Sequence, residues 1–150
     1  MGVITWSPLA AGWLTGKYRA ETGIDMTGHR AARLPVRFDP SLPGNQAKLA
    51  AVEDLIKLAA DAGHSLTHLA LAFASANPAV TSVIIGPRTR DQLTDLLAGA
   101  TVSLDDAILD QIDQIVAPGV TLNAPDAGWL SPTITDPSAR RRPPGDRSAA

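Results

Sequence analysis

Cysteine is absent from this sequence of 150 residues, and aromatic residues are scarce. Without cysteine the chain can form neither a disulfide framework nor a thiolate metal site, which fits the reducing cytoplasm. Aromatic residues make up 4% of the chain, whereas 45% is hydrophobic. We therefore expect a core built mainly from Ala, Leu, Ile and Val, in helices packed on a sheet.

Long hydrophobic runs and a strong excess of charge are also missing. No stretch approaches the roughly 18 consecutive apolar residues of a membrane span, and the first residues show no charged-then-apolar export pattern. The net charge of -2 and the pI of about 5.8 make nucleic acid a poor candidate partner, with Arg140–Arg142 as the one local basic run. These features predict a soluble cytoplasmic protein that binds neither a membrane nor nucleic acid.

Common phosphate and nucleophile motifs are lacking as well. A phosphate loop requires Gly, four residues, then Gly-Lys-Ser/Thr, but Gly16-Lys17 has Ala11 at the first glycine position and is followed by Tyr18. There is no Gly-x-Gly-x-x-Gly turn, and no Gly-x-Ser-x-Gly elbow surrounds Ser7. A Rossmann fold and a serine hydrolase both lose their main support.

Histidines and acidic residues form no metal site in the sequence. His64 and His68 are four residues apart, but Ser65 lies between them at an expected helix start. His64 is then predicted in a loop and His68 at the third helical position, so we expect no bound metal. The acidic residues are spread over exposed helix faces, without a glycosidase-like pair.

Two apolar runs predict strands. Val3–Trp6 is a short β-branched and aromatic run broken by Ser7-Pro8, and Val80–Ile85 is typical of a parallel strand buried on both faces. The first run starts so close to Met1 that we expect further chain upstream, which would pair with its edges. Residues 19–45 carry Gly, Pro, Arg and Asp without periodicity, and we expect a functional lid or a flexible segment there.

Two helices are predicted between these strands from apolar residues at three- and four-residue steps. The first covers about residues 46–62 and ends at Gly63 in a left-handed conformation. The second is capped by Ser65 and ends at Asn77-Pro78. Their expected inward residues are Leu49, Val52, Leu55, Ile56 and Ala59 in the first helix, and Leu66, Leu69, Phe73 and Ala76 in the second.

Two further helices follow the second strand. Thr89 and Gln92 predict a capping box for a helix that reaches Gly99, and Ser103 with Asp106 predicts the cap of the last helix. Their expected inward residues are Leu93, Leu96 and Leu97, then Ile108, Ile112 and Ile115.

This order of elements indicates an α/β fold with two parallel strands and flanking helices. Two strands cannot close a barrel, and they would expose large apolar faces unless more sheet were supplied. We therefore expect an incomplete domain over residues 1–118, with self-association through its exposed strand edges. Residues 119–150 are predicted to form an extended tail that is partly disordered.

Two segments carry a more specific signal. Residues 2–18 read GVITWSPLAAGWLTGKY, and residues 81–93 read TSVIIGPRTRDQL. Together they resemble the seventh and eighth strands, with the loops that follow them, of the aldo-keto reductases. The resemblance spans roughly residues 2–118, and Ala124–Trp129 with Arg140–Pro143 is similar to the carboxyl ends of some bacterial members. It implies the C-terminal part of a TIM (β/α)8 barrel that binds NADP, without the N-terminal half.

The resemblance assigns the first loop to the cofactor. Ligands bind at the carboxyl ends of the strands in such barrels. Trp6 matches the aromatic residue that stacks on the nicotinamide ring, although a core aromatic is the alternative. Lys17 is a weaker candidate, because a lone loop lysine is usually just solvated. The residues that match the loop along the pyrophosphate are Ser7, Leu9, Gly12 and Leu14.

The second loop matches the site of the adenosine 2'-phosphate. Gly86 and Arg88 match positions there, because a guanidinium fork suits a phosphate and the next helix offers its positive end. Gln92 and Asp95 match positions near the adenine and ribose, although Gln92 has a rival role as the capping-box partner of Thr89.

Two positions differ from the family pattern. Leu96 stands where an asparagine that reads the adenine is common, and Arg90 stands where proline is frequent. The adenine contacts are therefore less defined, and Arg90 either adds a phosphate contact or faces water.

The family reduces aldehydes and ketones by hydride transfer from NADPH, with a tyrosine acid held by lysine, aspartate and histidine of earlier strands. None of these positions lies in this chain, and the only tyrosine, Tyr18, belongs to the cofactor loop. The resemblance therefore implies no catalytic residue here, and activity on a small carbonyl substrate only if the missing half is supplied. The alternatives are a noncatalytic nucleotide- or partner-binding module of the same fold, as in subunits of membrane channels, and a truncated gene remnant.

Overall fold

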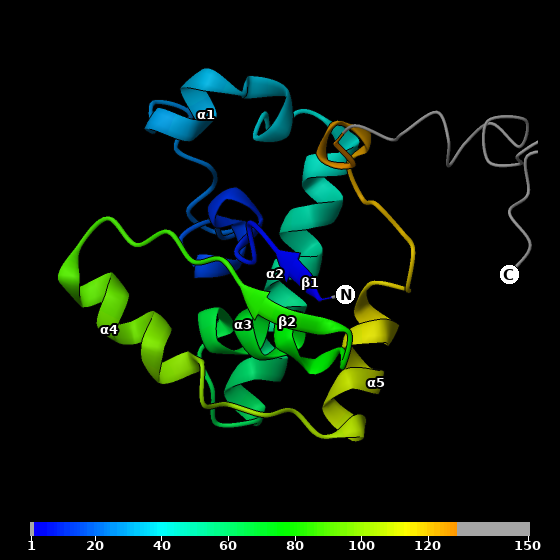
Figure 1. Ribbon diagram of the computed structural model, residues 1–150. Helices are drawn as coiled ribbons and strands as arrows, with labels where there is room; N and C mark the ends of the chain where they lie inside the picture. The colour runs from blue at the N-terminus through cyan, green and yellow to red at the C-terminus, as the bar shows by residue number, and fades with distance from the viewer. Residues whose placement is uncertain (1, 129–150) are drawn as a thin grey trace, which may run out of the picture.

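A two-stranded parallel sheet lies at the centre of the chain (Figure 1). The computed structural model describes residues 2–128. Strand β1 covers Val3–Thr5 and pairs with β2, Val80–Val83, in the register Ile4 to Ser82 and Thr5 to Val83. The predicted α/β arrangement with two parallel strands is confirmed for these residues.

Five α-helices and three short 3-10 segments surround the sheet in the described part of the chain. Helices α2 and α3 lie behind the sheet in Figure 1, and α4 and α5 lie on opposite sides of the molecule. None of the described helices is both long and apolar enough to cross a membrane. The α-helices are α1 His29–Arg33, α2 Pro43–Asp61, α3 Leu66–Ala76, α4 Arg90–Gly99 and α5 Asp106–Ile115, and the 3-10 segments are η1 Ala10–Thr15, η2 Pro35–Arg37 and η3 Ala124–Asp126.

The strands are shorter and more exposed than their apolar sequences predict. Val3 is 47% exposed, Ile4 is 64% exposed and Ile84, just after β2, is 55% exposed. The prediction that the second strand is buried on both faces is therefore wrong for this chain. The physical reason is that the two-stranded sheet packs one face against α3, and no layer formed by residues 2–128 covers the other face, so its outward side chains are exposed.

Local capping signals set the ends of α3 and α4. The hydroxyl of Ser65 accepts a hydrogen bond from His68 N at 3.1 Å, and Gly63 ends α2 with φ 75°. Thr89 and Gln92 form the predicted capping box of α4. These predictions are confirmed, because each depends only on residues within one helical turn.

The inward faces of the helices are predicted in part. In α2, Val52 and Ala59 are buried as expected, and in α5 Ile112 is buried. Phe73 of α3 is 47% exposed, and Leu93 and Leu97 of α4 are 39% and 56% exposed. Ala76 of α3 is exposed as well, so these four assignments are wrong. The side chains buried in α3 are those of Leu66, Leu69, Ala70, Leu71 and Ala72.

The cap of α5 differs from the prediction. Asp105, and not Ser103, precedes the helix, and its carboxylate accepts a hydrogen bond from Ile108 N at 2.9 Å. Asp is at least as good an N-cap as Ser, and either residue fits the sequence pattern.

Residues 19–45 form short helical turns and are not an irregular loop, and a role as a lid stays a prediction. They contain α1, η2 and the first turn of α2, and they bury Ala31 and Phe38 completely. The lack of periodicity in this region reflects helical turns too short to show it. Of the predicted tail, residues 120–128 include η3, and the basic end with Arg140–Arg142 lies outside the described residues.

Three aromatic side chains form the centre of the core. Trp13 is 3% exposed, Tyr18 is 5% exposed and Phe38 is fully buried. The rings of Trp13 and Phe38 stack with centroids 5.7 Å apart, and Tyr18 is tilted against both at 5.3 and 5.6 Å. The other buried hydrophobic residues are all Ala, Leu, Val or Ile, so the expectation of a mainly aliphatic core is confirmed, with these three aromatic rings at its centre.

The end of the first loop is tied to α2 by an ion pair. Arg19 donates from Nε and Nη2 to the carboxylate of Glu53, with Nη2 2.7 Å from Oε2, and Ala20 N donates to Oε1 at 2.8 Å. The hydrogen bonds from Arg19, followed by the one from Ala20, lower the pKa of Glu53 to about 2. Glu53 lies 34 positions after Arg19 and 33 positions after Ala20, so this contact is a long-range one.

Replacing Phe38 with alanine should destabilise the chain by about 3–5 kcal/mol, because it leaves a cavity between Trp13 and Tyr18. The matched control Phe73→Ala, at an exposed position, should cost less than about 1 kcal/mol. Urea unfolding followed by circular dichroism measures both values. Equal losses for the two variants would contradict the central place of the aromatic cluster.

Glu53→Gln should lower the melting temperature at pH 7, because the paired carboxylate of the folded chain has a pKa below its ordinary 4.5. The contribution is present above pH 4.5 and is lost as the pH falls toward about 2, so the difference from wild type should shrink over that window. Melting curves at several pH values test this, and a difference that is constant with pH would refute it.

Candidate functional site

The carboxyl ends of the two strands meet at one edge of the sheet. Ile84 N donates to Thr5 O at 2.8 Å, directly beyond the paired residues Thr5 and Val83. The loop that starts at Trp6 and the loop that leads to Arg88 therefore leave the sheet side by side. Ligands of parallel α/β sheets bind at such an edge.

The backbone of the first loop is unusually bent. Ser7, Ala10 and Ala11 have φ of 59°, 45° and 59°, in the left-handed region that non-glycine residues seldom adopt. Gly12 follows with φ 103°. Such conformations cost free energy and persist only where the surroundings impose them, so this loop has a defined shape.

Part of the expected phosphate donors in this loop are used internally. Gly12 N and Leu14 N both donate to Leu9 O, at 2.7 and 3.3 Å, and Ala10 N donates to Ser7 O at 2.9 Å. The side chain of Leu14 packs against the core. In this conformation the loop presents the Ser7 hydroxyl rather than a row of free amides.

Lys17 lies across the loop. A methyl group built on Gly12 would lie 3.1 Å from Lys17 Cε and 3.2 Å from Nζ. The Lys17 ammonium is also 4.5 Å from the centre of the Tyr18 ring. Gly12 thus makes room for a lysine that brings a positive charge to the loop.

The two tryptophans of this loop have opposite surroundings. Trp6 is 80% exposed, whereas Trp13 is buried in the aromatic cluster. The alternative interpretation of Trp6 as a core aromatic is therefore wrong for the described chain. A flat ring exposed at the end of β1 is free to contact a ligand.

The second loop leaves space beside the sheet. A methyl group on Gly86 would meet no atom within 4 Å, and its φ is not in the left-handed region. Nothing within the described residues therefore requires glycine at this position. Arg88 is exposed and has no carboxylate within ion-pair distance among residues 2–128.

Gln92 has the capping role that rivals a ligand contact. Its Oε1 accepts hydrogen bonds from Arg88 N at 2.8 Å and Thr89 N at 3.3 Å, while Gln92 N donates to Thr89 Oγ1 at 3.2 Å. The carbonyl oxygen is therefore used by the backbone. The bond to Arg88 N fixes the backbone from which the arginine side chain extends.

Asp95 and Leu96 turn toward the protein. Asp95 Oδ1 and its backbone oxygen are each 3.0 Å from His68 Nε2, although the side chain of Asp95 stays 55% exposed. Leu96 is 5% exposed and belongs to the core, so it is not available to an adenine. His68 lies at the third position of α3, as predicted, and joins α3 to α4.

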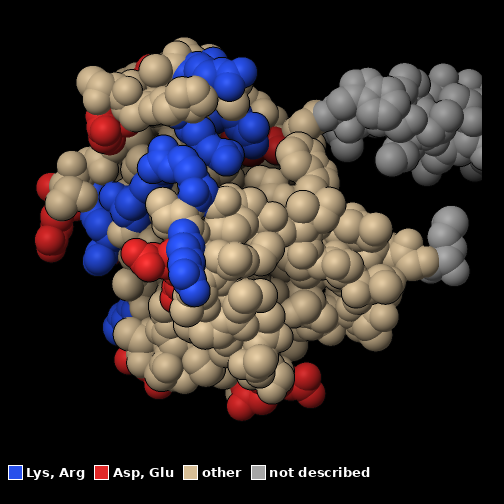
Figure 2. Space-filling view, turned by 60° about the vertical axis from the view of Figure 1, so that its left-hand side comes forward, with Lys and Arg blue, Asp and Glu red and all other residues tan. Residues whose placement is uncertain are grey.

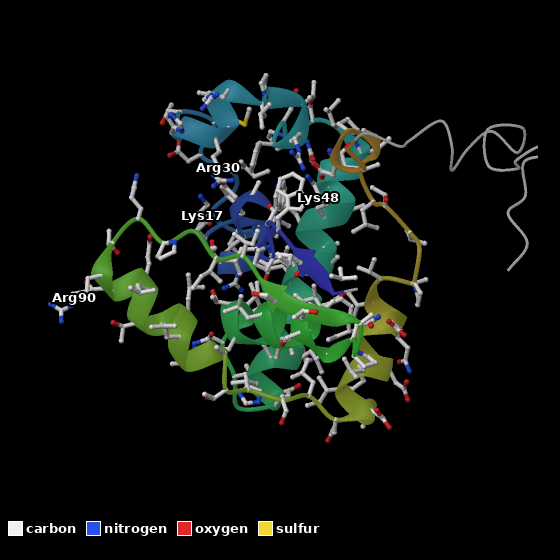
Figure 3. All side chains as sticks on the ribbon, in the orientation of Figure 1. Lys17, Arg30, Lys48 and Arg90 are labelled. Carbon is white, nitrogen blue, oxygen red and sulfur yellow. The ribbon has the colours of Figure 1, made fainter. Side chains whose placement is uncertain are left out.

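Basic side chains gather near these loops. Figure 2 shows Lys and Arg in a band that runs from the upper part of the molecule, where α1 lies, to its middle. In Figure 3, Lys17 and Arg30 lie on the side of α1 and the second loop, whereas Arg90 points away at the outer end of α4. The structure thus does not bring Arg90 to the other candidates.

A hollow of about 330 Å³ lies beside Lys17. Sequence reasoning identified only Lys17 among its lining residues. Loop residues of mixed type give no periodic or motif signal, which is why the others were missed. The lining consists of Lys17, Tyr18, Thr22, Gly23, Asp25 and Gly28.

The two loop glycines should respond differently to alanine. Gly12→Ala should destabilise the chain by about 1–3 kcal/mol, because φ of 103° strains an L-residue and the new methyl group meets Lys17. Gly86→Ala should change stability by less than about 0.5 kcal/mol, since it points into open space. Denaturant unfolding measures both. Equal losses would show that Gly86, too, is needed for the fold.

The sequence is similar to a known family over most of its length. Residues 1–117 match the sequence model of the aldo/keto reductase family. The chain is 35% identical over 127 residues to "Uncharacterized oxidoreductase YrpG" of Bacillus subtilis, an alignment that covers 85% of this chain and 35% of that protein.

Two other relatives have more specific names. The chain is 32% identical over 125 residues to a probable voltage-gated potassium channel subunit beta of Arabidopsis thaliana, covering 77% of this chain and 35% of that protein. It is 32% identical over 120 residues to L-glyceraldehyde 3-phosphate reductase of Escherichia coli, covering 79% and 34%. The chain spans about a third of the length of these relatives. Because the family match extends over more than half of its residues, this chain belongs to the aldo/keto reductase family.

Proposed function

We propose that this chain forms the NADP-holding part of a cytoplasmic carbonyl reductase with a TIM-barrel fold. The observation that carries the proposal is the pairing of β1 with β2, which starts the loops of Trp6 and Arg88 at one edge of the sheet. Family membership supports a nicotinamide cofactor, and the basic side chains near this edge favour a phosphorylated one.

Each loop has a separate task in this proposal. Trp6 offers an exposed flat ring to the nicotinamide, and Ser7 with Lys17 faces the pyrophosphate. The open space at Gly86 admits the ribose 2'-phosphate, which Arg88 binds through its guanidinium. Asp91 lies in the first turn of α4, so Arg88 rather than the bare helix end must supply the attraction. Gln92 holds the Arg88 backbone and leaves its amide nitrogen for the adenosine, and the carboxylate of Asp95, bonded to His68 but 55% exposed, offers its open side to the same group.

The proton donor is not among the described residues of this chain. Bound NADPH would supply the hydride to an aldehyde or ketone carbon. Tyr18 is 5% exposed and lies in the aromatic cluster, where it cannot reach a carbonyl oxygen. We therefore propose that turnover needs a further polypeptide segment, and that the chain alone binds cofactor without oxidising it.

The exposed apolar side chains of the sheet support the same idea. Val3, Ile4 and Ile84 are about half exposed, which is unfavourable for a free surface. We propose that the segment with the catalytic residues covers them. Self-association through the strand edges is the competing way to cover them, and it would make the apparent mass of the chain depend on concentration.

A noncatalytic role is the second candidate function. Relatives from Arabidopsis thaliana and Oryza sativa are named as probable potassium channel beta subunits, at 32% and 33% identity. In this case the chain would bind the dinucleotide or a partner protein and no carbonyl substrate. Aldehyde-dependent oxidation of NADPH, once the chain is combined with the remainder of a reductase barrel, would decide for the enzyme.

Arg88→Gln should weaken the binding of NADPH to the full chain by about 1.5–3 kcal/mol, because the 2'-phosphate loses its charged partner. The binding of NADH should stay unchanged, because NADH has no 2'-phosphate. Arg90→Gln is the matched control and should change neither affinity. Titration calorimetry measures all four. Equal losses for both cofactors would reject the phosphate role, and a wild-type chain that neither binds nor melts cooperatively would indicate a gene remnant.

A further inference from the structure

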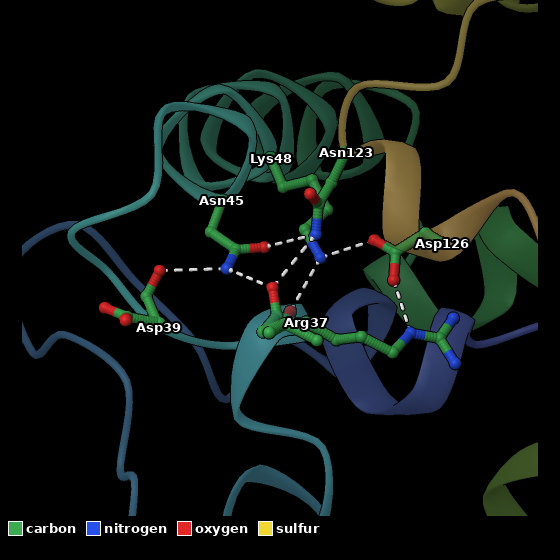
Figure 4. Close-up of polar contacts among 7 residues, drawn as sticks. Arg37, Asp39, Asn45, Lys48, Asn123 and Asp126 are labelled. Atoms are coloured by element: carbon green, nitrogen blue, oxygen red, sulfur yellow. Dashed lines mark hydrogen bonds and ion pairs between the residues drawn. The ribbon is translucent and has the colours of Figure 1, made fainter.

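A buried polar cluster lies on the far side of the cofactor loop, where the segment Leu122–Asp126 crosses the start of α2 (Figure 4). Asn45 is fully buried and donates to Val36 O at 3.1 Å and Asp39 O at 2.8 Å. Its Oδ1 accepts a hydrogen bond from Asn123 Nδ2 at 2.9 Å. Burying two amide side chains is costly unless both are satisfied, so this arrangement fixes one position of the segment.

The approach of this segment to α2 is close. A methyl group on Gly44 would lie 2.9 Å from both Leu122 O and Asn123 Oδ1. A side chain at position 44 would clash at these distances, so only glycine lets the start of α2 approach the backbone of Leu122 and Asn123 this closely. The segment Leu122–Asp126 therefore packs closely against α2 in one defined position.

Lys48 joins the docked segment to α2. Its ammonium donates to Asp126 Oδ2 at 2.6 Å and to Arg37 O at 2.8 Å, and its side chain is only 12% exposed. Arg37 donates from Nε to the other oxygen of Asp126. One carboxylate thus receives two cations, one from α2 and one from η2.

The same ammonium reaches the cofactor loop. Lys48 Nζ lies 4.1 Å from the centre of the Trp13 ring and 5.9 Å from that of Phe38. A cation over an aromatic face is attracted to it, more strongly where water is excluded. Trp13 is part of η1 and directly follows Gly12. The end of the Lys17 side chain packs against Gly12.

Both charges are consistent with this packing. Burial lowers the pKa of Lys48, and its hydrogen bond to Asp126 opposes that change. Burial raises the pKa of Asp126, but the bonds from Lys48 and Arg37 outweigh it and leave this pKa below its ordinary value. Asp126 is therefore an anion at neutral pH, and it holds the ammonium in place over Trp13.

We propose that Lys48 is a positioning residue of the cofactor loop, which transmits the docking of Leu122–Asp126 to Trp13 and so keeps Gly12 and Lys17 in the conformation that receives the dinucleotide. The expected effect of Lys48 on NADPH affinity rests on the proposed function above. The expected effect of Lys48 on the loop conformation does not, because that conformation can be measured without any ligand.

The test compares Lys48→Met, which keeps the unbranched stem and removes the charge, with Asp126→Asn in the full chain. Lys57→Met is the control, because it makes the same change at an exposed position of the same helix. Hydrogen exchange at Gly12 N and Leu14 N, both bonded to Leu9 O, reports on the loop. Exchange at Leu69 N, bonded to Ser65 O at 2.9 Å in a residue that is 2% exposed, reports on the core.

We expect loop exchange to rise about tenfold more than core exchange in both test variants, and the NADPH dissociation constant to rise about tenfold, with no change in the control. Loop exchange that rises no more than core exchange would overturn the proposal, as would an NADPH affinity that stays at the wild-type value in a wild type that binds. A wild-type chain that does not bind NADPH refutes the proposed function, and the exchange data alone then decide this inference. Should Lys48→Met not fold, Asp126→Asn decides, since it leaves Lys48 bonded to Arg37 O.

Discussion

The parallel pairing of β1 with β2 is the contact on which the rest of this molecule depends. It joins residues about 80 positions apart, and the hydrogen bond from Ile84 N to Thr5 O ends both strands at the same edge. Because both strands run in the same direction, the loops that follow them must leave from that edge. An antiparallel pair would have placed Trp6 and Arg88 at opposite ends of the sheet, where no single dinucleotide could contact both.

The shape of the first loop depends on contacts made elsewhere. Its backbone enters the left-handed region at three non-glycine residues, which is unfavourable in isolation. The aromatic cluster around Trp13 holds one end, and the ion pair of Arg19 with Glu53 holds the other. Lys48 connects the cluster to the segment near Asp126. The conformation of this loop thus depends on long-range contacts, although its sequence forms a single continuous motif.

Sequence reasoning succeeded where the determining contacts are local. The caps at Ser65 and Thr89 each involve residues within one turn, and they could be read directly. The cap of α5 was placed at Ser103 instead of Asp105, because two good capping residues lie close together. Phe38 and the Asp126 contacts could not be foreseen, since they join residues 78 to 89 positions apart or lie in a region without periodicity. One signal was available: Asn45 and Lys48 precede Val52 and Ala59 on the apolar stripe of α2, and polar residues on such a stripe indicate a buried partner.

The central claim of this account is that one dinucleotide contacts both loops at the strand edge. The most direct measurement is the change in backbone amide chemical shifts of the isotopically labelled chain when NADPH is added. The account predicts shifts at residues 6–17 and 86–95 that follow the same dissociation constant for NADPH and are larger than those on α5. Shifts confined to one of these two segments, or spread over α5 with neither loop affected, would contradict it.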